Sequence, residues 1–444
     1  MKRKRQRLST TPVEAYIEKF SHDARGLARI AGKTTFIQGA LPNETVLVEY
    51  TRQKNDYDEG QLIRVINQSP HRVSPKCPHY TSCGGCSLQH LDPTVQIHVK
   101  QQILIDLLTK IARCTPQHIL PPVVGDYWNY RNKARLSVRY VEKKQSTLVG
   151  FREQNNPRFI ADITRCSILH EQVDTHITAL RQLVDSLDEP RNIAQIEVAA
   201  GDQEVALIFR NLTAISTDDQ QRLREFADQY NFFIYLQPAG PDSVYLFYPQ
   251  DRGNLLSYAL PEYGINLHFK PTDFTQVNAS LNRQMVTLAL HLLALEPEDV
   301  VLDLYCGLGN FSLPMAKNCK WVIGVEGSEA MVQRAAMNAK LNDISNTDFY
   351  CANLDDENSI SLFEKYQFDK VLLDPPRTGA LTIVKKIHLI APKLIVYVSC
   401  NPATLARDTD ILVHQQGYQL VSVGVMDMFP HTAHVESIAL FVKG

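Results

Sequence analysis

The chain has 444 residues, which is too long for one hydrophobic core and suggests about three domains. Its composition, 44% hydrophobic and 21% charged, is that of a globular protein, and no apolar run approaches the roughly 20 residues of a membrane-spanning helix. The basic start of the chain, residues 1–7, has no apolar segment behind it, which argues against a secretory signal and favours a cytoplasmic protein without membrane association.

Charge is divided unequally along the chain, although the net charge is only −2. Residues 1–165 contain 26 lysines and arginines against 14 acidic residues, a net of +12, whereas residues 166–444 contain 20 against 34, a net of −14. This split predicts that one part of the protein binds a polyanion such as nucleic acid and another part processes it. An incidental charge difference between domains is the alternative.

The first 72 residues predict a basic tail, residues 1–10, followed by a small all-β unit at 11–72. Alternating or β-branched segments predict strands, and glycine-rich or polar segments predict turns at 26, 32–33, 41–43 and 56–60. Short strands at this spacing favour an OB-like barrel. The layout resembles the TRAM domain, an RNA-binding β-barrel, except that the usual turn glycine is Asn43, which tolerates a positive φ.

Three cysteines follow in a single run, Cys77-x5-Cys83-x2-Cys86. In a chain with nine cysteines and no secretory signal, so tight a cluster favours a bound metal centre over disulfides or unrelated thiols. A fourth ligand is needed, and Cys114 and Cys166 are the candidates. Four thiolates suit both a tetrahedral zinc ion and a cubane iron–sulfur cluster, and the spacing does not decide between them.

Residues 73–270 are assigned to a β-rich central domain that carries the cysteine site. A helix is expected at 94–113, where it can pack on the catalytic domain. Along the strand predicted at 131–139, the four basic residues share one face, because all have odd numbers: Arg131, Lys133, Arg135 and Arg139. Such a face predicts contacts with phosphates, and an ordinary solvated sheet face is the alternative.

From residue 271 to 444, strands and helices alternate, as is typical of a doubly wound parallel sheet. Gly307 and Gly309 follow the first strand and Glu326 ends the second, an arrangement typical of nucleoside binding. The third glycine of a nicotinamide site is absent, and no basic group is placed for a pyrophosphate. The site therefore favours S-adenosylmethionine, a sulfonium cation, over a nicotinamide cofactor, and methyl transfer over hydride transfer.

Cys400 ends the fifth predicted strand of this sheet and Asp374 ends the fourth, so both are expected at the ligand-binding edge. A thiolate that adds to C6 of a pyrimidine creates an enolate at C5, which can attack a sulfonium methyl group. A base must then remove the C5 proton, and Glu436 is the predicted base, with His431 or His434 as alternatives. A buried structural thiol is the alternative for Cys400, and these residue types do not distinguish uracil from cytosine.

Five motifs in this order resemble those of the RNA uracil-5 methyltransferases: 274–278 (FTQVN), 303–310 (DLYCGLGN), 374–377 (DPPR), 399–402 (SCNP) and 431–436 (HTAHVE). The resemblance implies a Rossmann-like S-adenosylmethionine-dependent methyltransferase domain, with Cys400 as nucleophile and Glu436 as base. It also implies contacts with S-adenosylmethionine by Gln276, Tyr305, Asn310, Glu326, Asn353 and Asp374. Asp374 is equally suited to contact the uracil.

The cysteine run combined with a TRAM-like barrel resembles the branch of this family that modifies 23S ribosomal RNA. This branch implies a [4Fe-4S] cluster on Cys77, Cys83, Cys86 and Cys166, and a monomeric enzyme with 23S ribosomal RNA as partner. Methyl addition needs no electron, so we expect the cluster to shape an RNA-binding surface. The alternatives are a tRNA uracil-5 or RNA cytosine-5 methyltransferase, or a non-catalytic iron–sulfur or zinc protein that binds RNA.

Overall fold

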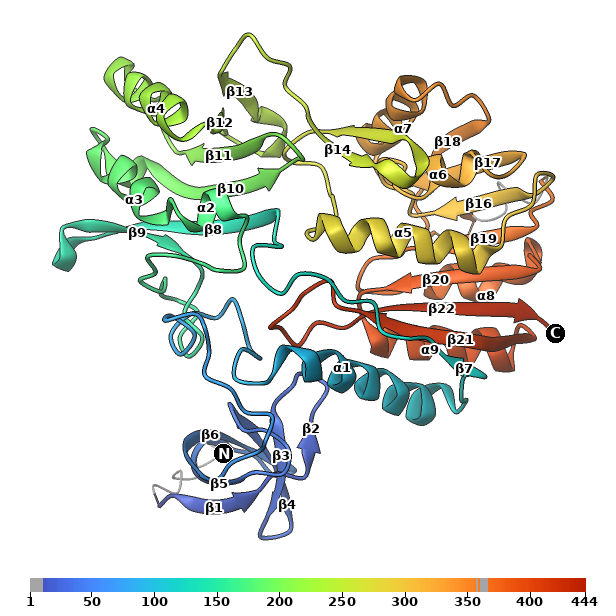
Figure 1. Ribbon diagram of the computed structural model, residues 1–444, viewed down its shortest axis with the longest axis horizontal. Helices are drawn as coiled ribbons and strands as arrows, with labels where there is room; N and C mark the ends of the chain where they lie inside the picture. The colour runs from blue at the N-terminus through green and yellow to red at the C-terminus, as the bar shows by residue number, and fades with distance from the viewer. Residues whose placement is uncertain (1–10, 357, 360–365) are drawn as a thin grey trace, which may run out of the picture.

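The computed structural model describes residues 11–356, 358–359 and 366–444, so the predicted basic tail lies outside the described part. Three large sheets follow one another along the chain, with a two-stranded sheet between the second and the third (Figure 1). Helix α1 lies between the first sheet and the strands drawn in red. Among the described residues, no helix combines the length and the apolar character that crossing a membrane requires.

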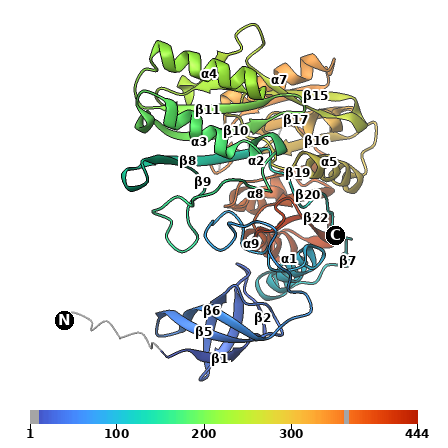
Figure 2. The ribbon, with the colours of Figure 1, turned by 60° about the vertical axis from the view of Figure 1, so that its left-hand side comes forward.

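The first sheet is a curled six-stranded sheet in the order β1-β5-β6-β4-β3-β2 (Figure 2). Its strands are β1 (Val13–Tyr16), β2 (Lys19–Phe20), β3 (Gly26–Ile30), β4 (Lys33–Gln38), β5 (Thr45–Gln53) and β6 (Tyr57–Asn67). Two expected turns proved wrong. Gly26 begins β3, and residues 57–60 belong to β6, because β6 pairs with both β4 and β5 there. The turn at Asn43 has the expected positive φ of 66°.

A buried ion pair ties this sheet to the chain that leaves it. The Glu44 carboxylate is fully buried and accepts hydrogen bonds from Arg72 Nε at 2.5 Å and Nη2 at 2.7 Å. It also accepts one from the backbone N–H of Leu41 at 2.9 Å, which closes the turn before β5. One carboxylate therefore holds both the turn and the exit from the sheet.

The central sheet has the order β13-β12-β11-β10-β8-β9. Its strands are β8 (Lys133–Val141), β9 (Ser146–Gly150), β10 (Ile193–Ala200), β11 (Val205–Asn211), β12 (Phe233–Leu236) and β13 (Tyr245–Tyr248), and its helices are α2 (Glu171–Asp174), α3 (Ile177–Ser186) and α4 (Thr217–Tyr230). Strands β14 (Leu256–Leu260) and β15 (Ile265–Phe269) form the separate pair. In β8, Arg135 and Arg139 are exposed while Ala134, Leu136 and Val138 are buried, so the predicted basic face is confirmed for these two arginines. Lys133 is half-buried and donates to the carbonyl of Asp273, and Arg131 precedes the strand.

The third sheet has eight strands in the order β18-β17-β16-β19-β20-β22-β21-β7. Its strands are β16 (Val300–Leu304), β17 (Trp321–Glu326), β18 (Thr347–Cys351), β19 (Lys370–Leu373), β20 (Leu394–Ser399), β21 (Tyr418–Met426) and β22 (Glu436–Lys443), with β7 (His118–Ile119) at the edge. Its helices are α5 (Ala279–Leu293), α6 (Ser312–Ala316), α7 (Glu329–Leu341), α8 (Leu381–Lys386) and α9 (Pro402–His414). The first five strands in this order, β18 to β20, run parallel, as the alternating pattern predicted.

The segment between the first and second sheets packs against the third. Helix α1 (Pro93–Leu107), capped by Asp92, and the π-helical turn η1 (Leu108–Ala112) that extends it bury apolar side chains in the same cluster as β21 and α9. Strand β7 then pairs in parallel with β21, with His118 opposite Ser422. Short 3-10 turns complete the description: η2 (Glu142–Lys144), η3 (Pro190–Asn192), η4 (Pro241–Ser243), η5 (Pro261–Tyr263) and η7 (Ile387–Leu389).

Replacing Glu44 by alanine should destabilise the first sheet, because it leaves Arg72 partly buried without its partner and opens the turn at Leu41. Breaking a buried pair from one side lowers the free energy of unfolding by about 3 kcal/mol. Urea unfolding measures this loss, with exposed Glu49→Ala on β5 as the control. Equal stabilities of the two variants would contradict the assigned role of Glu44.

Candidate active site

The loop after β16 brings backbone close to the end of β17. Tyr305, Gly307 and Gly309 all have positive φ, at 67°, 56° and 94°, and the Tyr305 N–H donates to the carbonyl of Val325 at 2.8 Å. Glu326 ends β17, where its Oε2 accepts from the Gly307 N–H at 3.2 Å. The glycines and the carboxylate are therefore joined, as expected of a nucleoside-binding edge.

A cleft of about 560 Å3 opens at this edge. Seven of the predicted catalytic and cofactor residues line it: Gln276, Tyr305, Asn310, Glu326, Asp374, Cys400 and Glu436. Asn353 does not line it. Its side chain is exposed beyond β18, and its Oδ1 accepts from the backbone N–H of Asp355 at 3.1 Å.

Cys400 lies between the end of β20 and the start of α9. Asn401 caps that helix by accepting from the Ala403 N–H at 3.1 Å, and it donates through Nδ2 to the carbonyl of Arg377 at 3.0 Å. The positive end of a helix favours a thiolate, but here burial and the nearby carboxylates of Glu436 and Asp374 outweigh it and raise the pKa of Cys400 to about 11. The unliganded site therefore holds a thiol.

Glu436 lies beside Cys400 because of the strand register. Strands β20 and β22 are antiparallel and pair Ser399 with Ser437, which places the next residue of β20 opposite Glu436. Burial and the neighbouring Asp374 raise the pKa of Glu436 to about 8, and burial raises the pKa of Asp374 to about 7. Both carboxyl groups can therefore exchange a proton near neutral pH.

The two histidines of the HTAHVE motif lie in different places. His434 lines the cleft, and its Nδ1 lies 3.3 Å from Arg377 Nη2. Burial and the Arg377 charge lower the pKa of His434 to about 4, so its imidazole is neutral. His431 does not line the cleft but stacks on Trp128, with ring centroids 4.0 Å apart.

A second cavity of about 390 Å3 lies on the other side of Cys400, which lines both spaces together with Arg377 and His434. His22 of the first sheet and Leu107 of α1 also line it. The N-terminal sheet thus reaches the neighbourhood of the candidate nucleophile. No local pattern in the sequence indicated this placement, since His22 lies in a polar segment between two strands.

Some residues that line the cleft were not among the site residues predicted from the sequence. Phe274, in the FTQVN motif, has 68% of its surface exposed at the cleft, and Phe429 lines it from the loop before β22. The motif itself marked Phe274 as worth attention. Tyr258, on β14, lies outside every motif and had no such signal.

Two observations test whether the cleft fits a nucleoside cofactor. The Tyr305 hydroxyl is buried and has no hydrogen-bond partner among the residues that the structure describes, which leaves a polar atom for a ligand to satisfy. The Asn310 amide, in contrast, is already paired with Asn282 through two hydrogen bonds of 2.9 Å, and its Oδ1 also accepts from Tyr258. Tyr305 thus presents an open contact, whereas Asn310 mainly holds the loop.

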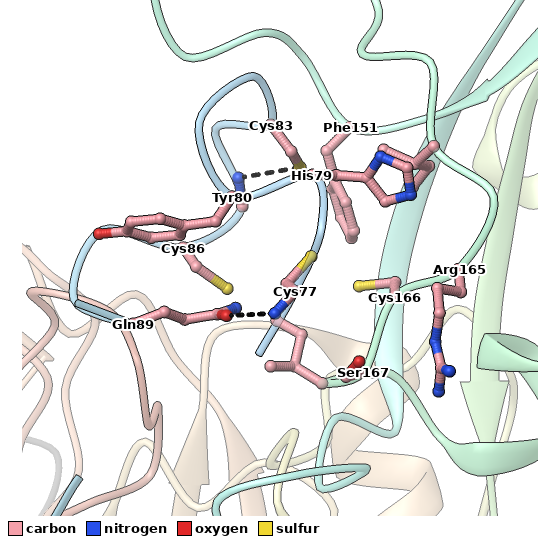
Figure 3. Close-up of a pocket in the computed structure, with 13 residues that line it drawn as sticks. Cys77, His79, Tyr80, Cys83, Cys86, Gln89, Phe151, Arg165, Cys166 and Ser167 are labelled. Atoms are coloured by element: carbon pink, nitrogen blue, oxygen red, sulfur yellow. Dashed lines mark hydrogen bonds between the residues drawn. The ribbon is translucent and has the colours of Figure 1, made fainter. Parts of the chain in front are cut away.

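The four predicted cysteine ligands line one cavity (Figure 3). Cys77, Cys83 and Cys86 approach from one loop and Cys166 from another, while Cys114 instead packs near the apolar core of the third sheet. Burial raises the pKa of all four thiols, that of Cys86 to about 12. Across the described part of the chain, no three His, Cys, Asp or Glu residues are grouped closely enough to hold a single metal ion.

Comparisons with known proteins agree with this architecture. A model of the family described as tRNA (Uracil-5-)-methyltransferase matches residues 125–443. This chain belongs to the uracil-5-methyltransferase family. Its predicted membership is confirmed.

Relatives in the family match the whole chain. The 23S rRNA (uracil(1939)-C(5))-methyltransferase RlmD of Legionella pneumophila (strain Paris) is 60% identical over all of both chains. The enzyme of the same name from Xanthomonas campestris pv. campestris (strain 8004) is 50% identical, again over all of both chains. The crystal structure of Pyrococcus abyssi tRNA (uracil-54, C5)-methyltransferase in complex with S-adenosyl-L-homocysteine superposes with a TM-score of 0.73 at 24% identity, covering 97% of this chain and 100% of that one. This superposition confirms the predicted methyltransferase fold.

Replacing Glu436 by glutamine should speed the alkylation of Cys400 at about pH 9, because it removes a negative charge that raises the pKa of the thiol. One pKa unit is a tenfold change in thiolate, so we expect about a two- to tenfold increase. At about pH 6 the effect should vanish, since Glu436 is then protonated. Arg377→Met removes a positive charge that lowers the pKa of Cys400, so it should slow the alkylation. Peptide-resolved mass spectrometry after iodoacetamide treatment measures each rate, and no difference at about pH 9 would contradict the assignment.

Proposed function

We propose that this chain methylates C5 of uracil 1939 in 23S ribosomal RNA, with S-adenosylmethionine as methyl donor. The observation that carries the proposal is that one cleft brings together Cys400, Glu436 and the glycine loop after β16. The two relatives at 60% and 50% identity, both named for uracil 1939, support this target. Uracil rather than cytosine follows from their names and from the family match.

The reaction we propose begins with Cys400. The Cys400 thiol first gives its proton to the ionised Glu436 carboxylate, which passes it on to solvent and is again free to act as a base. The resulting thiolate adds to C6 of the uracil, and the electron pair of the C5–C6 double bond forms an enolate that places negative charge on C5. S-adenosylmethionine, when bound, supplies an electrophilic methyl group on its sulfonium, and C5 takes that group. Glu436 then accepts the C5 proton, the double bond forms again, and Cys400 leaves as a thiolate.

The pKa values of the site suit both the addition of Cys400 and the later removal of the C5 proton. A carboxyl group with a pKa of about 8 is a stronger base than an exposed glutamate, and it can release its proton again near neutral pH. Arg377 opposes the effect of Asp374 on both Glu436 and Cys400, so it stabilises the negative charge that appears when either group ionises. The cleft thus favours a neutral resting site that ionises when the substrate needs it.

For the cofactor, we propose contacts by Gln276, Tyr305, Asn310, Glu326, Asn353 and Asp374. The open hydroxyl of Tyr305 and the position of Glu326 at the end of β17 support their assignments. Asn310 would act mainly through the loop that it holds. The assignment of Asn353 rests on the family motif alone, because its side chain lies outside the cleft lining.

We further propose a [4Fe-4S] cluster held by Cys77, Cys83, Cys86 and Cys166. Four thiols around one cavity, two buried and two half-buried, have raised pKa values and need a cationic partner to exist as thiolates. Four thiolates also suit a tetrahedral zinc ion, and the choice of a cluster rests on the resemblance of the cysteine run to the ribosomal RNA branch of the family. Cysteine thiolates are the usual ligands of such a cluster, and all four candidates line this one cavity.

We propose that residues 11–72 are a TRAM-like RNA-binding barrel, residues 73–270 the central domain with the cluster, and residues 271–444 the catalytic domain. The net charge of +12 over residues 1–165 and the basic face of β8 support RNA binding. The target uracil must leave its stack to reach Cys400, and the cavity that Cys400 shares with His22 is a route for it. We also propose a cytoplasmic location, which a ribosomal substrate supports, and a monomer, which a cleft lined by residues of one chain supports.

An RNA fragment that carries 5-fluorouridine at the target should trap the reaction, because fluorine at C5 cannot leave as a cation. The unmodified chain with S-adenosylmethionine should form a covalent complex that survives denaturing electrophoresis. Cys400→Ala should form none, while the matched control Cys351→Ala, at an exposed cysteine, should form it normally. Glu436→Gln should methylate ordinary uridine once and remain attached.

The same assay separates the competing functions. Methylcytidine in the digested product would indicate a cytosine enzyme, and a preference for tRNA over 23S transcripts would indicate the tRNA branch. RNA binding without consumption of S-adenosylmethionine would contradict the proposal altogether.

The metal proposal predicts about four irons and four sulfides per chain after anaerobic purification. Cys166→Ser should lose this content, whereas Cys114→Ser should keep it, because Cys166 lines the cavity and Cys114 does not. Stoichiometric zinc in the anaerobic protein would contradict a cluster.

A further inference from the structure

The loop 427–435, between β21 and β22, forms part of the cleft wall. It carries Phe429 and His434 into the cleft immediately before Glu436. Within it, His431 has a φ of 65°, a conformation that non-glycine residues rarely adopt and that persists where surrounding contacts fix it. The contacts that fix it come from outside the catalytic sheet.

The first set of contacts comes from the loop that carries Cys77, Cys83 and Cys86, here called the cysteine loop. The backbone N–H groups of Ser87 and Leu88, the two residues after Cys86, both donate to the carbonyl of His431 at 2.9 Å. The carbonyl of the preceding residue, Pro430, accepts from the Tyr130 hydroxyl at 3.0 Å. Backbone N–H groups of the cysteine loop therefore hold loop 427–435, which we call the catalytic loop, in place.

Helix α1 supplies the second set through one fully buried side chain, Gln96. Its Oε1 accepts from the His431 N–H at 2.8 Å, and its Nε2 lies 3.2 Å from His431 Nδ1. The same Nε2 donates to the carbonyls of Leu88 and Leu91 at 3.0 and 2.9 Å. Gln96 thus binds the cysteine loop and the catalytic loop at once.

One turn further along α1, Lys100 adds a buried ion pair. Its Nζ lies 2.6 Å from Asp427 Oδ1 and donates to the carbonyl of Phe429 at 2.9 Å, and both charged side chains are at most 1% exposed. A buried pair of this kind contributes more to a defined arrangement than to net stability. Here it fixes the beginning of loop 427–435 on the helix.

We propose that Gln96 and Lys100 are positioning residues that couple the cysteine loop to the catalytic loop, so that an intact metal centre is required for the proton-removal half of the reaction. Cys400 is held separately, by β20 and the cap of α9. Loosening the coupling should therefore leave the rate of adduct formation between Cys400 and the uracil unchanged. It should slow the later release of the methylated RNA from Cys400. The inference rests on the proposed function and on the proposed metal centre.

The test compares Gln96→Leu with Gln102→Leu, an exposed glutamine on the same helix, in the full chain loaded with its metal. With 5-fluorouridine RNA, both variants should form the adduct within about twofold of the unmodified rate. With ordinary RNA, Gln96→Leu should accumulate the covalent complex and lose about tenfold in kcat with little change in KM, since partial misplacement forfeits part of the 10²–10⁴ that a general base contributes. Gln102→Leu should behave as the unmodified chain.

A second readout does not depend on catalysis. Hydrogen exchange across 427–436 should quicken in Gln96→Leu, and also in the unmodified chain after oxidative loss of iron. The double variant Lys100→Met with Asp427→Leu removes the ion pair without leaving a lone buried charge. If Gln96→Leu does not fold, this double variant replaces it, and we expect the same faster exchange and the same accumulation of the covalent complex. The coupling would be contradicted if hydrogen exchange across 427–436 stayed the same after loss of iron. It would also be contradicted if a folded variant formed and released the covalent complex at the same rates as the unmodified chain. Absence of any adduct in the unmodified chain would instead contradict the proposed function.

Discussion

The parallel register of four neighbouring strands is the constraint on which the site depends. Strands β17, β16, β19 and β20 lie side by side with their carboxyl ends at one edge, so the residues that follow them meet in one cleft. Glu326, the loop at Tyr305, Asp374 and Cys400 each follow or end one of these strands. Strand β22 is antiparallel to β20, and its first residue, Glu436, therefore joins the same edge from the opposite direction.

Crowding acidic groups at a buried edge has an electrostatic consequence. Asp374, Glu436 and Cys400 each have a raised pKa, because burial disfavours their charged forms. The negative charge of Asp374 raises the pKa of Glu436 further, and both carboxylates raise that of Cys400. Arg377 is the neighbouring cation that opposes this effect. A site of this kind keeps its nucleophile unreactive at rest and its carboxyl groups ready to exchange protons, which suits a reaction that first needs a thiolate and later a base.

The N-terminal half contributes to the catalytic unit as well as to its surface. Helix α1 and strand β7 pack on the third sheet, and Gln96 hydrogen-bonds to His431, 335 residues away in the sequence. Such long-range polar contacts tie the cysteine loop to loop 427–435, so the parts form one unit around the cleft. The chain folds back on itself at β7, where it leaves the catalytic sheet and begins the central one (Figure 1).

The sequence by itself determined the alternation of strands and helices after residue 271, the strand ends that carry Asp374 and Cys400, and the clustered cysteines, because periodicity and turn residues are local signals. The spacing left Cys114 and Cys166 open, the family resemblance favoured Cys166, and the tertiary structure places Cys166 at the cysteine cavity. Tertiary structure alone decided that His434 rather than His431 faces the cleft and that Asn353 lies outside it. It also decided that residues 57–60 extend a strand, since pairing with two neighbours outweighs their turn-like composition. These outcomes depend on contacts between distant segments, which no local pattern encodes.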